Sequence, residues 1–232
     1  MSIDKKKFWD EKIIGWEVGR YDQKDQDGKL LETSANRLSE SLRFRINLAR
    51  EVIAPICRGK HVLELGCGSA RLMPDFMAAG AASYHGIDIS SAAIDEAQER
   101  VVSGGYGDNV RLTVGGIDAA TGTDADIVLS LGLLDWLTDY KLRKLFSLSK
   151  STMFFHAIAE KRFSLAQYLH RAYVHLSYGY RSNGYVPRYY SVSDIEALSG
   201  LSSSEGQVSF YRDPRLSFGA IVHNLPEISK PA

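Results

Sequence analysis

The fold can be inferred from one part of the chain, Val62-Leu63-Glu64-Leu65-Gly66-Cys67-Gly68-Ser69-Ala70-Arg71. It begins as a short apolar run and ends in two glycines, which is typical of a buried β-strand followed by a tight turn. Glycines at such a turn let the backbone approach a ligand closely, and the N-terminus of a following helix presents free N–H groups. We therefore expect a ligand at the carboxyl end of this strand.

Two acidic residues near this turn indicate the kind of ligand. Asp88 ends the next apolar run, where a carboxylate can accept hydrogen bonds from both hydroxyls of a ribose. Glu64 precedes Gly66 by two residues and favours a ligand with an ammonium group over a pyrophosphate. The nicotinamide fingerprint G-x-G-x-x-G/A also fails, because Arg71 stands at its sixth position. The sequence predicts a nucleoside-bearing ligand, and these two residues argue against a dinucleotide.

Apolar runs and helical patterns alternate after residue 60, which predicts an α/β domain with a doubly wound, mostly parallel sheet. Near the end, two strand-like runs flank Asp213-Pro214-Arg215 and predict an antiparallel hairpin. The expected strands are 61–65, 82–88, 110–114, 126–130, 152–159, 207–212 and 216–223, and the expected helices among them are 69–79 and 91–101.

Composition excludes several classes of protein. The 232 residues carry 28 Lys plus Arg and 28 Asp plus Glu, and a net charge of zero argues against a protein that coats nucleic acid or an anionic membrane. Two cysteines without a Cys/His cluster argue against a disulfide scaffold or a structural metal site. The first twelve residues lack an apolar core of signal-peptide length, and no run of 18 apolar residues occurs. We expect a cytoplasmic protein without a membrane partner or a metal.

Three segments together resemble class I S-adenosylmethionine-dependent methyltransferases. Glu64-x-Gly66-x-Gly68-x-Ala70 is similar to the first motif of that family, with alanine in place of its third glycine. Gly86-Ile87-Asp88-Ile89-Ser90 is similar to the second motif, and residues 126–137 to the fourth-strand region. The resemblance covers roughly residues 45–225. It implies a Rossmann-like sheet of seven strands that ends antiparallel, and S-adenosylmethionine as the cofactor.

The resemblance also implies positions for the cofactor. Gly66 and Gly68 would pass under its methionine part, with Cys67 between them and Glu64 near the ammonium group through a water molecule. Asp88 would bind the ribose. The remaining implied contacts are Ile89 on the adenine ring, Asp118 on the adenine amino group, and Leu131 and Gly132 at the methyl-transfer end.

Residues 1–59 are predicted to be mostly helical and resemble the lid that small-molecule methyltransferases fold over the cofactor. In this lid, Tyr21 or Arg45 is expected to reach the methionine carboxylate. Residues 60–232 would form the core of the domain. Within the core, residues 160–190 are expected to cover the acceptor pocket.

Methyl transfer requires alignment of acceptor, methyl group and sulfur, and a hydroxyl acceptor usually also needs a base. His156, at the end of a predicted strand, is our first candidate, and Asp135 is the second. The cover segment holds seven tyrosines and five basic residues against the single acid Glu160, which suits an anionic, sugar-bearing or aromatic small molecule. The predicted substrate-binding residues are Arg162, Tyr168, Arg171, Tyr180, Arg181 and Arg188.

Other interpretations remain open. The same fold could serve an RNA or a protein acceptor, although the balanced charge of the chain argues against a large surface that binds nucleic acid. A nicotinamide-dependent oxidoreductase is less compatible with Glu64 and Arg71. A subunit that binds the cofactor without catalysis is a further alternative, and the tyrosines of residues 160–190 could simply pack around an extra helix.

Overall fold

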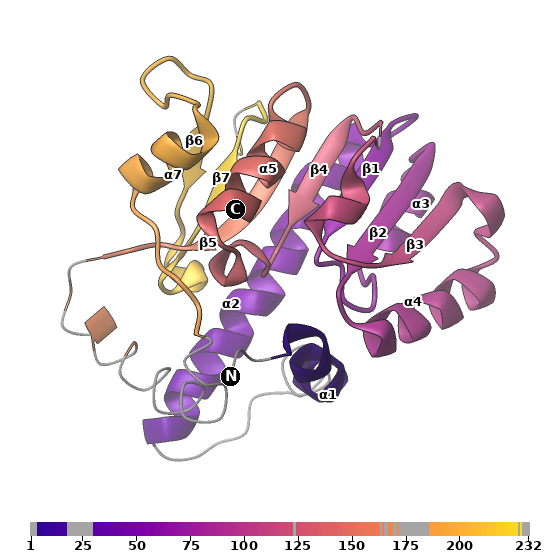
Figure 1. Cartoon of the computed structure of the whole chain (residues 1–232), viewed down its shortest axis with the longest axis horizontal. Helices are drawn as coiled ribbons and strands as arrows, with labels where there is room; N and C mark the ends of the chain where they lie inside the picture. The colour runs from indigo at the N-terminus through magenta and orange to yellow at the C-terminus, as the bar shows by residue number, and fades with distance from the viewer. Residues whose placement is uncertain are drawn as a thin grey trace.

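The computed structural model describes residues 4–17, 30–122, 124–162, 164, 167–168, 171, 186–226 and 228. Within them, seven strands form one sheet in the order β3-β2-β1-β4-β5-β7-β6 (Figure 1). This confirms the predicted α/β fold with a mostly parallel sheet and an antiparallel C-terminal hairpin. The strands are β1 (His61–Leu65), β2 (Ser83–Asp88), β3 (Val110–Val114), β4 (Ile127–Ser130), β5 (Met153–Ala159), β6 (Ser209–Tyr211) and β7 (Gly219–His223).

The first strand lies in the middle of the sheet, as its continuous apolar sequence requires. Val62 pairs with Tyr84 of β2 on one side and with Ile127 of β4 on the other. Residues 62–65 are all buried, because strands covered on both faces must be apolar along their length. Strands β1 to β5 pair in parallel, so their carboxyl ends meet at one edge of the sheet, here called the carboxyl edge. The strand order reverses between β1 and β4, where ligands of such sheets bind.

The helices begin and end at residues that satisfy their free backbone groups. Ser90 caps α4 by accepting a hydrogen bond from the Ala93 N–H, and Gly105 ends it in the left-handed conformation. Ser191 and Asp194 form a capping box on α7. The described helices include α1 (Lys5–Glu17), α2 (Leu30–Ile53), α3 (Met73–Ala78), α4 (Ser91–Gly104), α5 (Asp139–Ser149) and α7 (Val192–Ser199).

Several predicted elements are shorter than expected, and the strand predicted for residues 216–223 begins only at Gly219. The helix predicted for residues 69–79 starts only at Met73, because Ala70 has a φ of +53° in a tight turn between the strand and the helix. The strand predicted for residues 207–212 is reduced to Ser209–Tyr211, and a short 3₁₀ helix, Pro214–Leu216, joins it to β7.

Two apolar cores lie on the two faces of the sheet. Phe146 of α5 and Phe154 of β5 pack in one core, with edge-to-face rings whose centroids are 6.4 Å apart. Leu48 and Ile53 of α2 are buried in the other, so the C-terminal half of α2 belongs to the core of the domain. Helix α1 packs beside α4 at the carboxyl edge (Figure 1).

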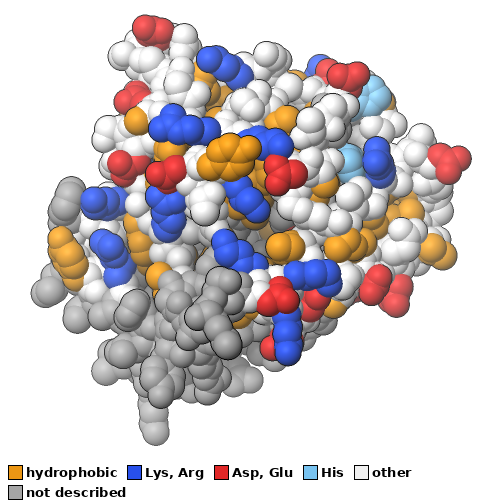
Figure 2. Space-filling view, viewed as in Figure 1, with side chains coloured by type: hydrophobic (Ala, Val, Ile, Leu, Met, Phe, Trp, Pro, Cys, Tyr) orange, Lys and Arg blue, Asp and Glu red, His pale blue; other side chains and the backbone are white. Residues whose placement is uncertain are grey.

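Charges of both signs are mixed on the face that carries α5 and α7. Figure 2 shows Lys and Arg side chains interspersed with Asp and Glu there, and two of the ion pairs are Lys144 with Asp118 and Arg188 with Asp139. None of the helices within the described residues has both the length and the apolar character needed to cross a membrane.

Candidate functional site

The turn after β1 and the end of β2 form the centre of the site. Gly66 and Gly68 have φ values of +71° and +53°, a conformation that favours glycine. The Gly66 N–H donates to the Ile87 carbonyl at 2.8 Å, which holds the turn against β2. The Asp88 carboxylate accepts hydrogen bonds from the N–H groups of Gly68 and Ser90, both at 2.9 Å. Residues predicted from two separate motifs therefore lie together.

Buried carboxylates surround this turn. Glu64 is 4% exposed, and its Oε2 accepts a hydrogen bond from the Tyr84 hydroxyl at 2.6 Å. Burial, together with the neighbouring carboxylates of Glu17 and Asp88, raises the pKa of Glu64 to about 8, although the hydrogen bond from Tyr84 opposes the rise. Burial also raises the pKa of Asp88. Carboxylates crowded in this way are costly to ionise, and a positively charged ligand would offset that cost.

The third carboxylate, that of Glu17, comes from α1 and was not predicted. It accepts hydrogen bonds from the Ser69 N–H, at 3.1 Å, and from the Ser69 hydroxyl, and it contacts the Nε of Arg71 at 3.5 Å. A second acid of α1, Asp10, accepts hydrogen bonds from the Ser90 hydroxyl at 2.8 Å and from the Ala92 N–H. The two acids stand seven residues apart, a helical spacing that places them on one face and was the available signal in the sequence.

Three other predicted cofactor residues, Cys67, Ile89 and Asp118, differ in how deeply they are buried. Cys67 is buried against Gly86, and burial raises the pKa of its thiol well above the usual range, so it is an inert packing residue. Ile89 is half-buried beside Asp88. Asp118 lies in the 3₁₀ helix Ile117–Ala120 after β3, and its exposed carboxylate pairs with Lys144 at 2.6 Å.

The predicted contacts at the end of β4 centre on Arg45 of α2. Leu131 is buried, and its carbonyl accepts a hydrogen bond from Arg45 Nη1 at 3.1 Å. Arg45 is itself only 8% exposed and packs beside Gly219. Gly132 follows Leu131 at the carboxyl edge. Tyr21, the other residue expected to reach the methionine carboxylate, lies outside the described residues.

His156, our first candidate for a base, does not face the site. It is fully buried in the middle of β5, where its Nδ1 lies 3.0 Å from the Ser130 hydroxyl and its Nε2 lies 3.0 Å from the Ser149 hydroxyl. Its ring stacks on Phe154, and burial lowers its pKa to about 3. A neutral imidazole enclosed in this way cannot reach a substrate, so His156 is a structural residue.

Asp135, the second candidate, lies at the carboxyl edge. It is 7% exposed, in the 3₁₀ turn Leu134–Trp136 after β4, and its Oδ1 accepts a hydrogen bond from the Ala159 N–H at 2.7 Å, where β5 ends. Burial raises the pKa of Asp135 to about 6, although the charge of Arg45 opposes the rise. Such a carboxylate is ionised at neutral pH and basic enough to accept a proton.

Of the four predicted substrate-binding residues that the structure describes, three already have partners. Arg162 pairs at 2.9 Å with Glu160, a buried residue that also pairs with Arg212. Arg188 pairs with Asp139. These contacts assign Arg162 and Arg188 to structural ion pairs. Arg171 lies over the ring of Tyr189, 5.0 Å from its centroid, and Tyr168 is 55% exposed. Tyr180 and Arg181 lie outside the described residues.

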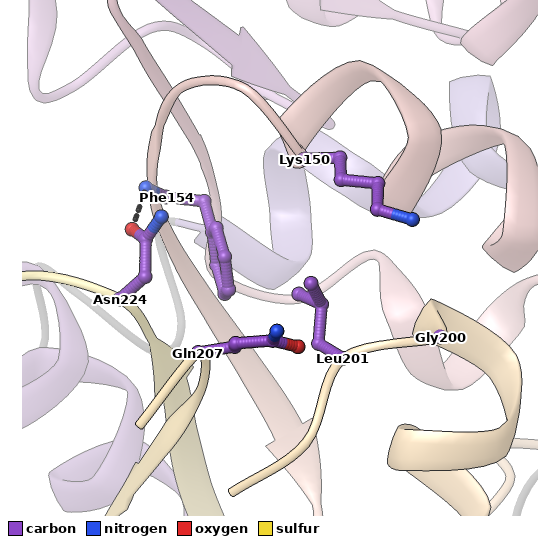
Figure 3. A pocket seen from close by; sticks show the side chains of 6 residues that line it. All are labelled: Lys150, Phe154, Gly200, Leu201, Gln207 and Asn224. Carbon is purple, nitrogen blue, oxygen red and sulfur yellow. Dashed lines mark hydrogen bonds between the residues drawn. The ribbon is translucent and has the colours of Figure 1, made fainter. Parts of the chain in front are cut away.

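A cavity of about 370 Å³ lies elsewhere, at the opposite edge of the sheet (Figure 3). It is between the end of α5 and the end of β7, and Lys150, Phe154, Gly200, Leu201, Gln207 and Asn224 line it. Two of its polar side chains are already engaged: the Asn224 Oδ1 accepts from the Phe154 N–H at 2.7 Å, and Gln207 donates to Glu205. Its position at the opposite edge of the sheet separates it from the carboxylates at the carboxyl edge.

Comparison with known proteins agrees with this geometry. Residues 62–152 match the family model described as a methyltransferase domain. A comparison with curated protein sequences found no match.

Three solved structures share the fold at low sequence identity. Magnesium protoporphyrin IX methyltransferase from Synechocystis PCC 6803 is 20% identical with a TM-score of 0.64, over 94% of this chain and 96% of that one. A possible exported protein from Bordetella parapertussis is 14% identical with a TM-score of 0.67, over 90% and 77%. An O-methyltransferase family protein from Burkholderia thailandensis is 12% identical with a TM-score of 0.58, over 94% and 69%.

Proposed function

We propose that this chain, a class I S-adenosylmethionine-dependent methyltransferase by the domain in residues 62–152 and by its sheet, methylates a small molecule at the carboxyl edge. One observation carries the proposal. Two buried carboxylates, those of Glu64 and Asp88, flank a Gly-x-Gly turn at the point where the strand order reverses. A ligand with a nucleoside and two positive charges, a sulfonium and an ammonium, suits such a site.

The roles of the site residues follow from their positions. The Asp88 carboxylate has lone pairs beyond those that accept from the Gly68 and Ser90 N–H groups, so it can also accept from ribose hydroxyls. Glu64 is buried near the end of β1, just before the turn, and can stabilise the ammonium group. The bound cofactor supplies the electrophilic methyl group. The solved Synechocystis enzyme was crystallised with SAH and with SAM, which supports the same cofactor here.

Asp135 is the residue best placed to act on the acceptor. It follows β4 at the carboxyl edge and is buried, and its raised pKa of about 6 suits a general base toward a hydroxyl group. Tyr189 lies near enough for the charge of Asp135 to raise the pKa of Tyr189, to about 12 together with burial. Arg171 stacks on the same tyrosine and adds a positive charge. An aromatic or anionic acceptor fits these neighbours.

The mixed surface charge favours a small acceptor over a nucleic acid. Lys and Arg on the face shown in Figure 2 are interspersed with acids, and both Lys144 and Arg188 are paired with carboxylates. Binding to a phosphate backbone instead depends on a continuous basic surface that releases counterions.

A labelling experiment tests this function. The purified protein is incubated with methyl-labelled S-adenosylmethionine and separate extract fractions that contain small molecules, RNA or protein. We expect label in the small-molecule fraction, and much less of it with Asp135→Asn. Label only in RNA or in protein would overturn the proposed acceptor class, and binding of NAD(P)H in place of the cofactor would overturn the reaction.

A further inference from the structure

The carboxylate of Glu17 lies against three donor groups that are suited to binding a carboxylate. Its two oxygens accept from the Ser69 N–H and the Ser69 hydroxyl and contact the Arg71 guanidinium. Ser69 is fully buried, and Glu17 is 5% exposed. Glu17 Oε1 also lies so close over Gly68 that an added Cβ there would collide with it. A backbone N–H, a hydroxyl and a guanidinium form a complete carboxylate-binding subsite, which the chain fills with its own side chain.

We propose that Ser69 and Arg71 bind the carboxylate at the amino-acid end of the cofactor, and that Glu17 competes for this subsite in the ligand-free chain. The inference rests on the proposed function. The cofactor carries a carboxylate beside its ammonium group, and the site offers the complementary pair: Ser69 and Arg71 after the Gly-x-Gly turn, and Glu64 before it in the chain. Two carboxylates cannot occupy one subsite, so the side chain of Glu17 must leave before the cofactor is fully seated.

A separate contact holds α1 at the site independently of Glu17. Asp10 accepts from Ser90 and Ala92 at the start of α4, and Lys6 donates to both Asp10 and Ser91, at 2.7 and 2.8 Å. Hydrogen bonds from Lys6 and Ser90 lower the pKa of Asp10 to about 2, so this contact persists at neutral pH. Removal of the Glu17 carboxylate therefore frees the subsite without detaching the helix.

Calorimetric titration with S-adenosylmethionine, and with the analogue that lacks the carboxylate, tests the inference. Glu17→Gln should bind S-adenosylmethionine about tenfold more tightly than the wild type, because a neutral amide holds the three donors less strongly than a carboxylate does. The decarboxylated analogue should gain nothing. Glu11→Gln is the matched control, since Glu11 is an exposed acid of the same helix; it should leave both affinities unchanged.

Arg71→Met provides a second, opposite readout. It should weaken binding of S-adenosylmethionine and leave binding of the decarboxylated analogue unchanged. Unchanged or weaker binding of S-adenosylmethionine by Glu17→Gln, or equal losses for both ligands in Arg71→Met, would overturn the carboxylate subsite alone. If wild type and variants all fail to bind S-adenosylmethionine, the proposed function falls with it. Thermal unfolding of each variant shows whether it is folded.

Discussion

Glu64 should make cofactor binding depend on pH. In the ligand-free chain, burial and the neighbouring carboxylates of Glu17 and Asp88 raise its pKa to about 8, so Glu64 is mostly protonated at neutral pH. A cation bound beside Glu64 lowers that pKa, because it favours the charged carboxylate. Binding should then release a proton from Glu64, and affinity should rise as pH rises toward 8.

The size of the effect follows from the pKa. With a value of about 8, the ionised fraction is roughly 1% at pH 6 and roughly 10% at pH 7, so affinity should rise about tenfold between them if only the ionised form binds. The rise should flatten near pH 8, where the α-amino group of the ligand also begins to lose its proton, at about 7.7–8.0.

Calorimetry at pH 6.0, 6.5, 7.0 and 7.5, in pairs of buffers that differ in ionisation enthalpy, measures both the affinity and the released proton. Glu64→Gln keeps a partner for the Tyr84 hydroxyl but cannot titrate, so its affinity should be nearly constant over this range. A flat wild-type profile, or the same slope in Glu64→Gln, would refute the assignment of Glu64 to the cationic part of the cofactor.

The remaining predictions concern catalysis and stability. If Asp135 is the base, Asp135→Asn should lower kcat by about 10²–10⁴-fold and leave cofactor affinity unchanged. The single-turnover rate of the wild type should decrease when the pH is lowered below about 6. A kcat of the variant close to that of the wild type would remove this role. His156→Ala should cost about 2–4 kcal/mol of unfolding free energy in urea yet retain activity per folded molecule. Because the folded pKa of His156 is about 3 against 6.5 unfolded, wild-type stability should fall as pH drops below about 6.5, and His156→Ala should lose that component.

The centre of the site could be predicted because it depends on short-range sequence. Gly66 and Gly68 mark a turn with positive φ, and Asp88 ends an apolar run, so each feature is visible within a few residues. Parallel pairing of adjacent strands then places both at one edge of the sheet. The mostly parallel sheet and its antiparallel end followed from the alternation of strands and helices and from the closing hairpin, whereas the order of the strands was not predicted.

The predictions of site residues were incomplete or wrong where the contacts of a side chain depend on tertiary packing. The contact of Glu17 with Ser69 joins residues 52 positions apart and depends on where α1 docks. The ion pair that engages Arg188 with Asp139 likewise joins distant segments. His156 was misjudged although the sequence held a signal: side chains alternate along a strand, so His156 shares the face of Phe154 and Ile158, which pack in an apolar core.

The central claim is that the carboxyl edge binds S-adenosylmethionine through Asp88. The most direct measurement is calorimetric titration of wild type, Asp88→Ala and Asp95→Ala with S-adenosylhomocysteine, where Asp95 is an exposed acid on the nearby helix α4. We expect one site in the wild type and in Asp95→Ala, and affinity at least about tenfold weaker in Asp88→Ala, the loss expected for hydrogen bonds to a charged group. Absence of binding by the wild type, or equal affinity in all three proteins, would contradict the account.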